Sequence, residues 1–181
     1  MKAWHGYKAS GPMEVGMVFL KGDETPSKII ILAYGLEDGL GSFYRAMASK
    51  MTDRDVEGIL MKLAAIEVFH KQKLFELYRD KNPDVDDIKT FETKIVSNAM
   101  EGGLSTEEFL EQNKSAMETV VDVLNIAMMI ETQSLDLYLR YSQKSSDKRT
   151  KAILFDLAEE EKDHLKALGD MIEKKIPEEM K

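Results

Sequence analysis

Cysteine is absent from this chain of 181 residues, and its absence excludes several kinds of site. Without a thiol the chain can form no disulfide, no cysteine-ligated zinc site, no thiol nucleophile and no iron–sulfur or rubredoxin-type centre of its own. Long apolar runs are also missing, since none approaches the ~20 residues that a membrane-spanning helix needs. The first residues lack the compact apolar run of a secretory signal. We therefore expect a cytoplasmic protein without a membrane anchor.

Positive charge is in the minority. The chain has 25 Lys and Arg residues against 33 Asp and Glu residues, which gives a formal net charge of −8. Such a chain would repel a phosphate backbone, so nucleic acid is not an expected partner. The hydrophobic fraction of 43% and the charged fraction of 32% are typical of a globular protein. The length fits one domain with a core of its own.

The first 24 residues differ from the rest of the chain. Glycine and proline interrupt them at Gly6, Gly11, Pro12, Gly16 and Gly22, which predicts a non-helical arm. His5 is expected to lie in this arm rather than in a site. Residues 25–181 carry helical apolar periodicity and are expected to form one four-helix bundle.

Four long helices are predicted. The first runs from Pro26 to about Lys50 with Thr25 as its N-cap, and the second runs from Asp53 to Asp80 with Thr52 as its N-cap. A capping box at 115–118 is predicted to open the third, which continues to Lys144. The fourth follows a short turn at 145–147 and ends near Lys175.

The connections predict how these helices are arranged. Only a few residues join the first helix to the second and the third to the fourth, so each pair should form an antiparallel hairpin. Residues 81–114 are long enough to cross from one hairpin to the other. Within this crossover we expect one short helix at 88–101 and another opened by a capping box at 105–108. The predicted fold class is therefore all-α.

A duplicated motif lies inside the predicted helices. Glu67 and His70 have the spacing Glu-x-x-His, and Glu161 and His164 repeat it 94 residues later. Residues i and i+3 lie on one face of a helix, so each motif directs a carboxylate and an imidazole the same way. Two further glutamates complete the pattern, each 30 residues before a motif and 94 residues apart. They are Glu37 and Glu131.

This set of six residues is the ligand pattern of a carboxylate-bridged dinuclear metal site in a four-helix bundle. Any one of the six could instead be a half-exposed residue at a helix edge. Taken together on one repeat they are better explained as metal ligands, because burying a glutamate is costly unless it is paired or bound to metal. Carboxylate and imidazole ligands without thiolate suit two ions of iron or manganese better than structural zinc.

Several nearby residues are weaker candidates. Tyr44 and Tyr138 each follow a candidate glutamate by seven residues, and we expect them to donate hydrogen bonds near the site or to fill the core, with a redox role as the alternative. Tyr34, three residues before Glu37, is a candidate of the same rank. Glu160, like its neighbour at 159, is expected on a solvated face, with a supporting role at the site as the alternative for Glu160 if the helix is shifted. The 12 methionines are expected to fill the core.

Three glycines surround Glu37, at 35, 39 and 41. Each costs on the order of 1 kcal/mol relative to alanine inside a helix, so their presence needs a reason. Close packing between helices is one explanation. The alternative is a distorted turn that opens the site to a small oxidant.

The paired motifs resemble those of the rubrerythrin-like branch of the ferritin-like superfamily, over about residues 26–175. The resemblance implies a ferritin-like bundle with a diiron site that reduces hydrogen peroxide or dioxygen in its diferrous form. It also implies that the six residues named above correspond to carboxylate and histidine ligands of the family. We expect a homodimer.

The chain departs from that family in two respects. Rubrerythrins carry a further ligand glutamate three residues after the one on the third helix, where this chain has Ser134. The shift of one iron between that glutamate and a histidine is therefore not expected here, and His70 should be a ligand in both oxidation states. The chain also has no cysteine with which to build a rubredoxin domain, so either an external donor protein supplies the electrons or the physiological activity is not peroxidase turnover.

Two alternative functions are open at this stage. One is a ferroxidase or iron-handling protein, and the other is a non-catalytic metal-binding module associated with a rhodanese. The second is suggested by residues 2–6, Lys-Ala-Trp-His-Gly, which resemble the closing segment of a rhodanese domain. An ordinary N-terminal arm explains those residues equally well.

Overall fold

The computed structural model describes residues 25–85, 87–95 and 106–176. In these ranges the chain is helical and has no strand, so the predicted all-α class is confirmed. The four long helices are α2 (Pro26–Ala48), α3 (Arg54–Lys81), α6 (Val120–Lys144) and α7 (Lys148–Lys175). The predicted N-terminal arm and its rhodanese-like segment lie outside the described residues. In the part of the chain described here, no helix is long and apolar enough to cross a membrane.

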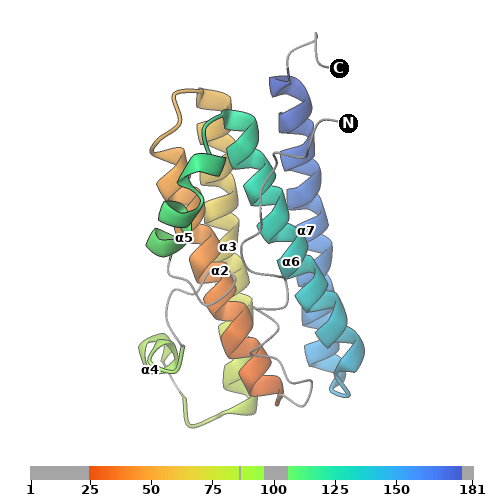
Figure 1. The fold of residues 1–181 in the computed structure, drawn as a ribbon. Helices are drawn as coiled ribbons and strands as arrows, with labels where there is room; N and C mark the ends of the chain where they lie inside the picture. Colours follow the sequence, from red (N-terminus) through yellow and green to blue (C-terminus); the bar gives the residue numbers. More distant parts are fainter. Residues whose placement is uncertain (1–24, 86, 96–105, 177–181) are drawn as a thin grey trace.

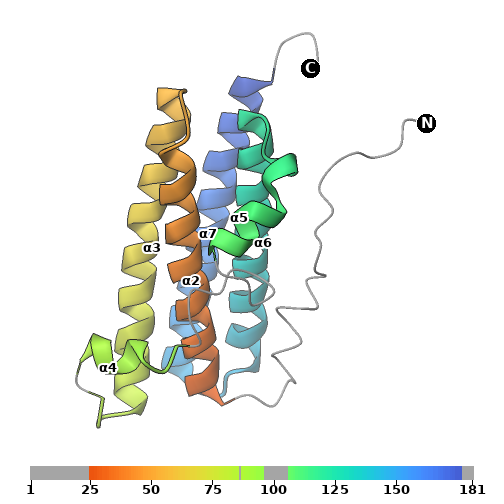
Figure 2. The same ribbon diagram turned by 60° about the vertical axis from the view of Figure 1, so that its left-hand side comes forward.

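The long helices form two antiparallel hairpins. Contacts are densest between α2 and α3 and between α6 and α7, and the two hairpins pack side by side as a four-helix bundle (Figures 1 and 2). The end of α3 and the start of α6 lie at opposite ends of the bundle, so the crossover runs along its length. Its described parts include α4 (Ile88–Glu92), α5 (Thr106–Gln112) and a short 3-10 helix, η2 (Lys114–Ala116).

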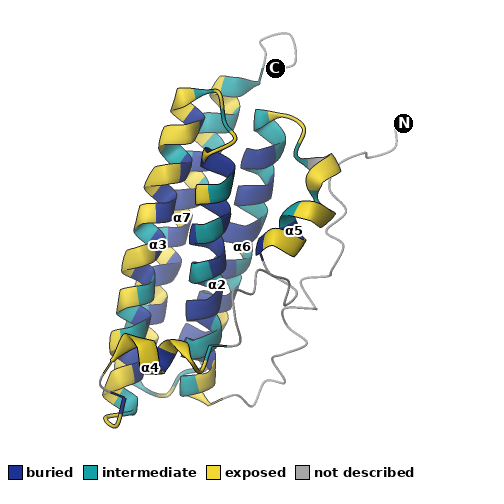
Figure 3. Cartoon of the chain, turned by 90° about the vertical axis from the view of Figure 1, so that its left-hand side faces the viewer, coloured by how far each residue is buried: buried dark blue, intermediate teal, exposed yellow. Residues whose placement is uncertain are grey.

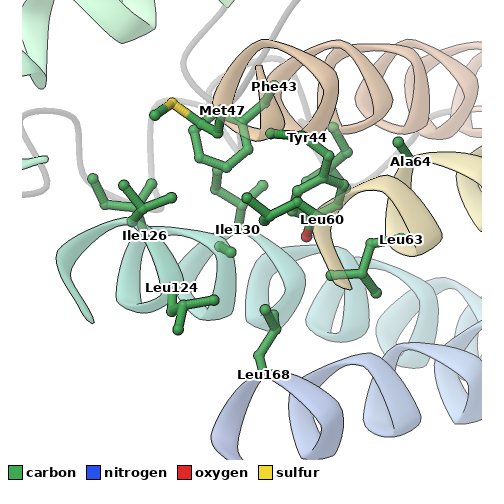
Figure 4. Packing of buried hydrophobic residues seen from close by; sticks show 14 of the residues in the cluster. Phe43, Tyr44, Met47, Leu60, Leu63, Ala64, Leu124, Ile126, Ile130 and Leu168 are labelled. Atoms are coloured by element: carbon green, nitrogen blue, oxygen red, sulfur yellow. The ribbon is translucent and has the colours of Figure 1, made fainter. Parts of the chain in front are cut away.

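The helices α3 and α7 each bury one stripe and expose the other, whereas α2 and α6 are buried or half-buried along most of their length (Figure 3). The buried stripes form two apolar clusters. The first includes Phe43, Met47, Leu60, Leu63, Leu124, Ile130 and Leu168 (Figure 4). The second includes Ile30, Tyr34, Leu74, Leu77, Leu137, Leu154 and Leu157. Burying a side chain of this size contributes roughly 1.5–3 kcal/mol, so the two clusters are the main source of stability.

The two clusters are separated by one polar layer. On α2 the second cluster reaches Tyr34 and the first begins at Leu40, with Glu37 between them. On α3 the first cluster ends at Ala64 and the second begins at Leu74. The helices α6 and α7 change cluster at the equivalent positions. Every long helix therefore crosses from one apolar cluster to the other at its candidate ligands.

The helix α2 is regular through the three glycines around Glu37, which supports close packing over a distorted turn. Gly41 faces α3, where a Cβ atom would lie 3.5 Å from the Cβ of Glu67 and 3.4 Å from a guanidinium nitrogen of Arg45. These are ordinary van der Waals distances, so Gly41 packs against α3 at a separation that an added Cβ atom would also fit.

Two predicted helix starts are wrong by a few residues. The N-cap of α3 is Asp53 rather than Thr52, because the Asp53 carboxylate accepts hydrogen bonds from two backbone N–H groups of the first turn. The helix α6 begins after Thr119, not at Ser115, which lies in η2. Thr119 and Asp122 form a reciprocal capping box directly before the apolar run. The N-cap at Thr25 is confirmed.

The observed start of α6 after Thr119, rather than at Ser115, predicts the outcome of two alanine substitutions. Thr119→Ala should lower the free energy of unfolding by about 1 kcal/mol, because it removes an N-cap side chain that satisfies a backbone N–H. Ser115→Ala should change it by less than ~0.5 kcal/mol, as is usual for exposed surface positions. Urea denaturation of both variants measures this. A larger loss for Ser115→Ala than for Thr119→Ala would contradict the observed start of α6.

Candidate metal centre

The polar layer consists of the six residues predicted as metal ligands, all of them buried. Each long helix contributes, with α2 and α6 providing one glutamate each and α3 and α7 providing a glutamate and a histidine. Their ligand atoms fall into two groups, each within 4.8 Å. One is Glu37, Glu67, His70 and Glu161, and the other is Glu67, Glu131 and His164. Glu67 belongs to both groups.

The Nδ1 atoms of the two histidines have nearly equivalent surroundings. Nδ1 of His70 lies 2.9 Å from an oxygen of Glu67 and 3.4 Å from an oxygen of each of Glu37 and Glu161. Nδ1 of His164 lies 3.0 Å from an oxygen of Glu161, and is 3.3 Å from Glu131 and 3.7 Å from Glu67. The two rings are stacked with centroids 5.4 Å apart. The 94-residue repeat thus produces an approximate two-fold relation between two half-sites.

These separations fit ligands that converge on metal ions. Two atoms bound to one ion at right angles, each ~2.1 Å away, would lie about 3 Å apart. Six carboxylate oxygens of the layer are buried and accept no hydrogen bond from any described residue; they belong to Glu37, Glu67, Glu131 and Glu161. Their short distances to the imidazoles lack hydrogen-bond geometry. Leaving so many buried carboxylate oxygens unpaired would be costly, and divalent cations would pair with them.

The pKa values of these residues in the metal-free protein also favour bound cations. Burial raises the pKa of Glu37, Glu67 and Glu131, and the neighbouring carboxylates raise it further. Burial opposes the charged form of His164, but the close carboxylates of Glu131 and Glu161 outweigh it and raise the pKa of His164 to about 10. Burial opposes the charged form of Glu161 too, yet both imidazoles lower its pKa to about 2. The metal-free layer therefore holds protons that metal ions would displace.

The tyrosines differ from one another. The hydroxyl of Tyr44 donates a hydrogen bond to Oε1 of Glu131 across the two hairpins, as predicted for a residue beside the site. The hydroxyl of Tyr138 is buried and has no hydrogen-bond partner among the described residues. The hydroxyl of Tyr34 donates to Glu92 on α4 at 2.8 Å rather than to a candidate ligand. Of the three, only Tyr44 is shown to orient a candidate ligand.

One contact was missed by the sequence analysis. Glu160 stays partly exposed, with 38% of its side chain accessible, but its Oε2 is 2.9 Å from Nε2 of His70 and its Oε1 binds the ammonium of Lys73. Glu159, by contrast, pairs with Lys162 at the surface. Helical periodicity places Glu160 beside the inner position at Glu161 but does not fix which neighbouring helix it reaches. The alternative of a supporting role for Glu160, which depends on how the helix is rotated, is the one that agrees with this contact.

Comparison with known proteins identifies the family. Residues 28–168 match the family model described as Rubrerythrin. A solved structure, a hypothetical protein from Pyrococcus furiosus, has a similar fold, with a TM-score of 0.67 and 22% identity over 90% of this chain and 94% of that chain. No curated protein matches the sequence. The family match covers most of the chain and includes both hairpins and all six candidate ligands. The chain therefore belongs to the rubrerythrin family.

Proposed function

We propose that this chain is a non-haem diiron oxidoreductase that reduces hydrogen peroxide, with dioxygen as a second oxidant. The observation that carries the proposal is the buried layer of four glutamates and two histidines, in which six carboxylate oxygens lack hydrogen-bond partners among the described residues. Membership of the rubrerythrin family supports the choice of iron. Two ferrous ions supply one electron each, which matches the two electrons needed to reduce peroxide to water.

The proposed ligand roles follow from the distances. Glu37 and His70 would bind one ion, and Glu131 and His164 would bind the other. Glu67 and Glu161 approach both histidines, so they would bridge the two ions. The hydroxyl of Tyr44 would hold Glu131 in place as a ligand. Each ion then has oxygen and nitrogen ligands only, a set that suits iron or manganese.

Two features of the chain restrict how it would work. Ser134 is buried on α6, three residues after Glu131, and its hydroxyl cannot replace a carboxylate as an alternative ligand. His70 is therefore expected to remain a ligand in both oxidation states. The absence of cysteine means that electrons for repeated turnover would come from a separate donor protein.

Anaerobic titration of the iron-loaded, reduced protein with hydrogen peroxide tests the function. We expect about one peroxide consumed per two ferrous ions, because the reaction H2O2 + 2e− + 2H+ gives two water molecules. Oxidation should be much faster than that of the same concentration of free ferrous ion, and a chemical reductant should restore the reduced state. The matched control is Glu67→Gln, which should lose this rapid phase.

The same titration separates the alternatives. Uptake of many iron ions per chain during oxidation would contradict the proposal and favour an iron-handling protein. No reaction with peroxide or dioxygen, with two ions bound, would contradict it and favour a non-catalytic metal-binding module.

A further inference from the structure

A charged pair outside the six candidate ligands contacts the polar layer on one side only. Glu160 lies on α7 beside Glu161, and its Oε2 is 2.9 Å from Nε2 of His70 on α3. A carboxylate accepts hydrogen bonds, so Nε2–H of His70 is the donor. The other carboxylate oxygen of Glu160 accepts from the ammonium of Lys73, also on α3. With the ring proton on Nε2, Nδ1 of His70 is the nitrogen directed at the glutamates.

The repeat does not reproduce this arrangement at the second histidine. The position 94 residues before Glu160 is Ile66, and the position 94 residues after Lys73 is Ala167. Neither an isoleucine nor an alanine side chain can accept a hydrogen bond or carry charge. Although the candidate ligands are related by the repeat, the residues that support the two imidazoles are not.

We propose that Glu160 is a positioning residue for His70, and that it makes the metal position beside His70 bind more tightly than the position beside His164. This inference rests on the proposed metal centre. A carboxylate that accepts the outer N–H of a ligating imidazole fixes the tautomer and the ring orientation and increases the basicity of the ligand. Lys73 holds the carboxylate in turn, so two side chains, Glu160 from α7 and Lys73 from α3, support one ligand.

Stepwise binding of Mn2+ to the metal-free protein, followed by calorimetry, tests the proposal. Mn2+ is suited to this set of ligands and avoids oxidation during the titration. The wild type should bind two ions with different affinities. Glu160→Ala should weaken the tighter site by about 10–100-fold and leave the weaker site within about two-fold of its original value. Glu160→Gln keeps an acceptor oxygen without the charge, so it should restore part of the affinity.

The matched control is Glu159→Ala, which removes the same charge from the adjacent position on α7, where Glu159 pairs with Lys162. It should leave both affinities unchanged. Equal effects of Glu159→Ala and Glu160→Ala would mean that the loss of a negative charge on α7, and not the contact with His70, weakens metal binding. That result would overturn the proposal. Unchanged affinities in Glu160→Ala would also overturn it, as would equal weakening of both sites. Failure of the wild type to bind any ion would overturn the proposed function and this inference together.

A second readout reports the hydrogen bond itself. In the Co2+-loaded protein, the outer N–H of a ligating imidazole gives a proton NMR signal shifted by the metal and observable only when exchange with water is slow. The wild type should show such a signal from His70, and Glu160→Ala should lose it, whereas Glu159→Ala should retain it. A spectrum unaffected by Glu160→Ala would contradict the role of Glu160 even if the protein binds two ions.

Discussion

Adding ferrous or manganous ion to the metal-free protein should raise its melting temperature by about 10–20 °C. At a free ion concentration of 100 times the dissociation constant, each site adds ~2.7 kcal/mol to the free energy of unfolding. For a chain of this size, 1 kcal/mol corresponds to roughly 2–4 °C. The physical reason is that the metal-free layer holds four carboxylates in the core, with six of their oxygens lacking hydrogen bonds from described residues.

The rise in melting temperature caused by metal should become larger as the pH rises from about 6.5. The pKa of His164 in the folded, metal-free protein is about 10, against an ordinary value of 6.5, so the folded chain holds a proton that the unfolded chain has released between these values. The free energy of unfolding of the metal-free protein therefore falls as pH rises through this window. Metal ions bind the deprotonated ligands, so the free energy of unfolding of the metal-loaded protein does not fall in this way.

Thermal melts at pH 6.5, 7.5 and 8.5, with and without metal, measure both effects. His164→Gln is the control, because it lacks the group that titrates and should show a smaller dependence of the metal-free melting temperature on pH. Equal melting temperatures with and without metal, at concentrations where binding is established independently, would contradict a buried metal centre.

The second large expected effect concerns which glutamates are shared between the two half-sites. Glu67→Gln should reduce metal content from about two ions per chain to less than one, because Glu67 approaches both half-sites and an amide is a much poorer ligand than a carboxylate. Glu37→Gln should leave about one ion, since Glu37 belongs to a single half-site. Elemental analysis after removal of free metal provides the measurement.

These two variants are matched, because burial raises the pKa of both carboxyls in the metal-free protein and a neutral glutamine replaces each with little change in shape. Their metal-free melting temperatures should therefore remain close to that of the wild type, which checks the fold. Equal loss of metal in Glu37→Gln and Glu67→Gln would contradict the assignment of Glu67 as a bridging residue.

The position of the six candidate ligands could be predicted because it depends on local geometry. The spacing of Glu67 and His70 fixes their common face, and similar distances from the two hairpin turns bring the four glutamates to one level. The structure confirms that all six lie together, and metal binding by them stays a prediction. The same periodicity gave the bounds of α2, α3 and α7 to within about two residues.

Other features depend on contacts between helices, which the sequence pattern does not encode. Whether Glu160 faces solvent or His70 is decided by how α7 packs against α3. The repeat predicts equivalent roles for Tyr44 and Tyr138, yet only Tyr44 reaches a glutamate. The start of α6 was placed too early because Ser115 and Thr119 both begin capping-box patterns, and only the second directly precedes the buried run.

The most direct test of the dinuclear centre is anomalous X-ray diffraction from crystals of the iron-loaded protein, measured on both sides of the iron absorption edge. Two peaks should appear in the polar layer, about 3.5–4 Å apart as in other two-metal sites, one beside His70 and one beside His164, with Glu67 and Glu161 between them. A single peak, or peaks only at the surface of the bundle, from protein loaded with excess iron would contradict the account.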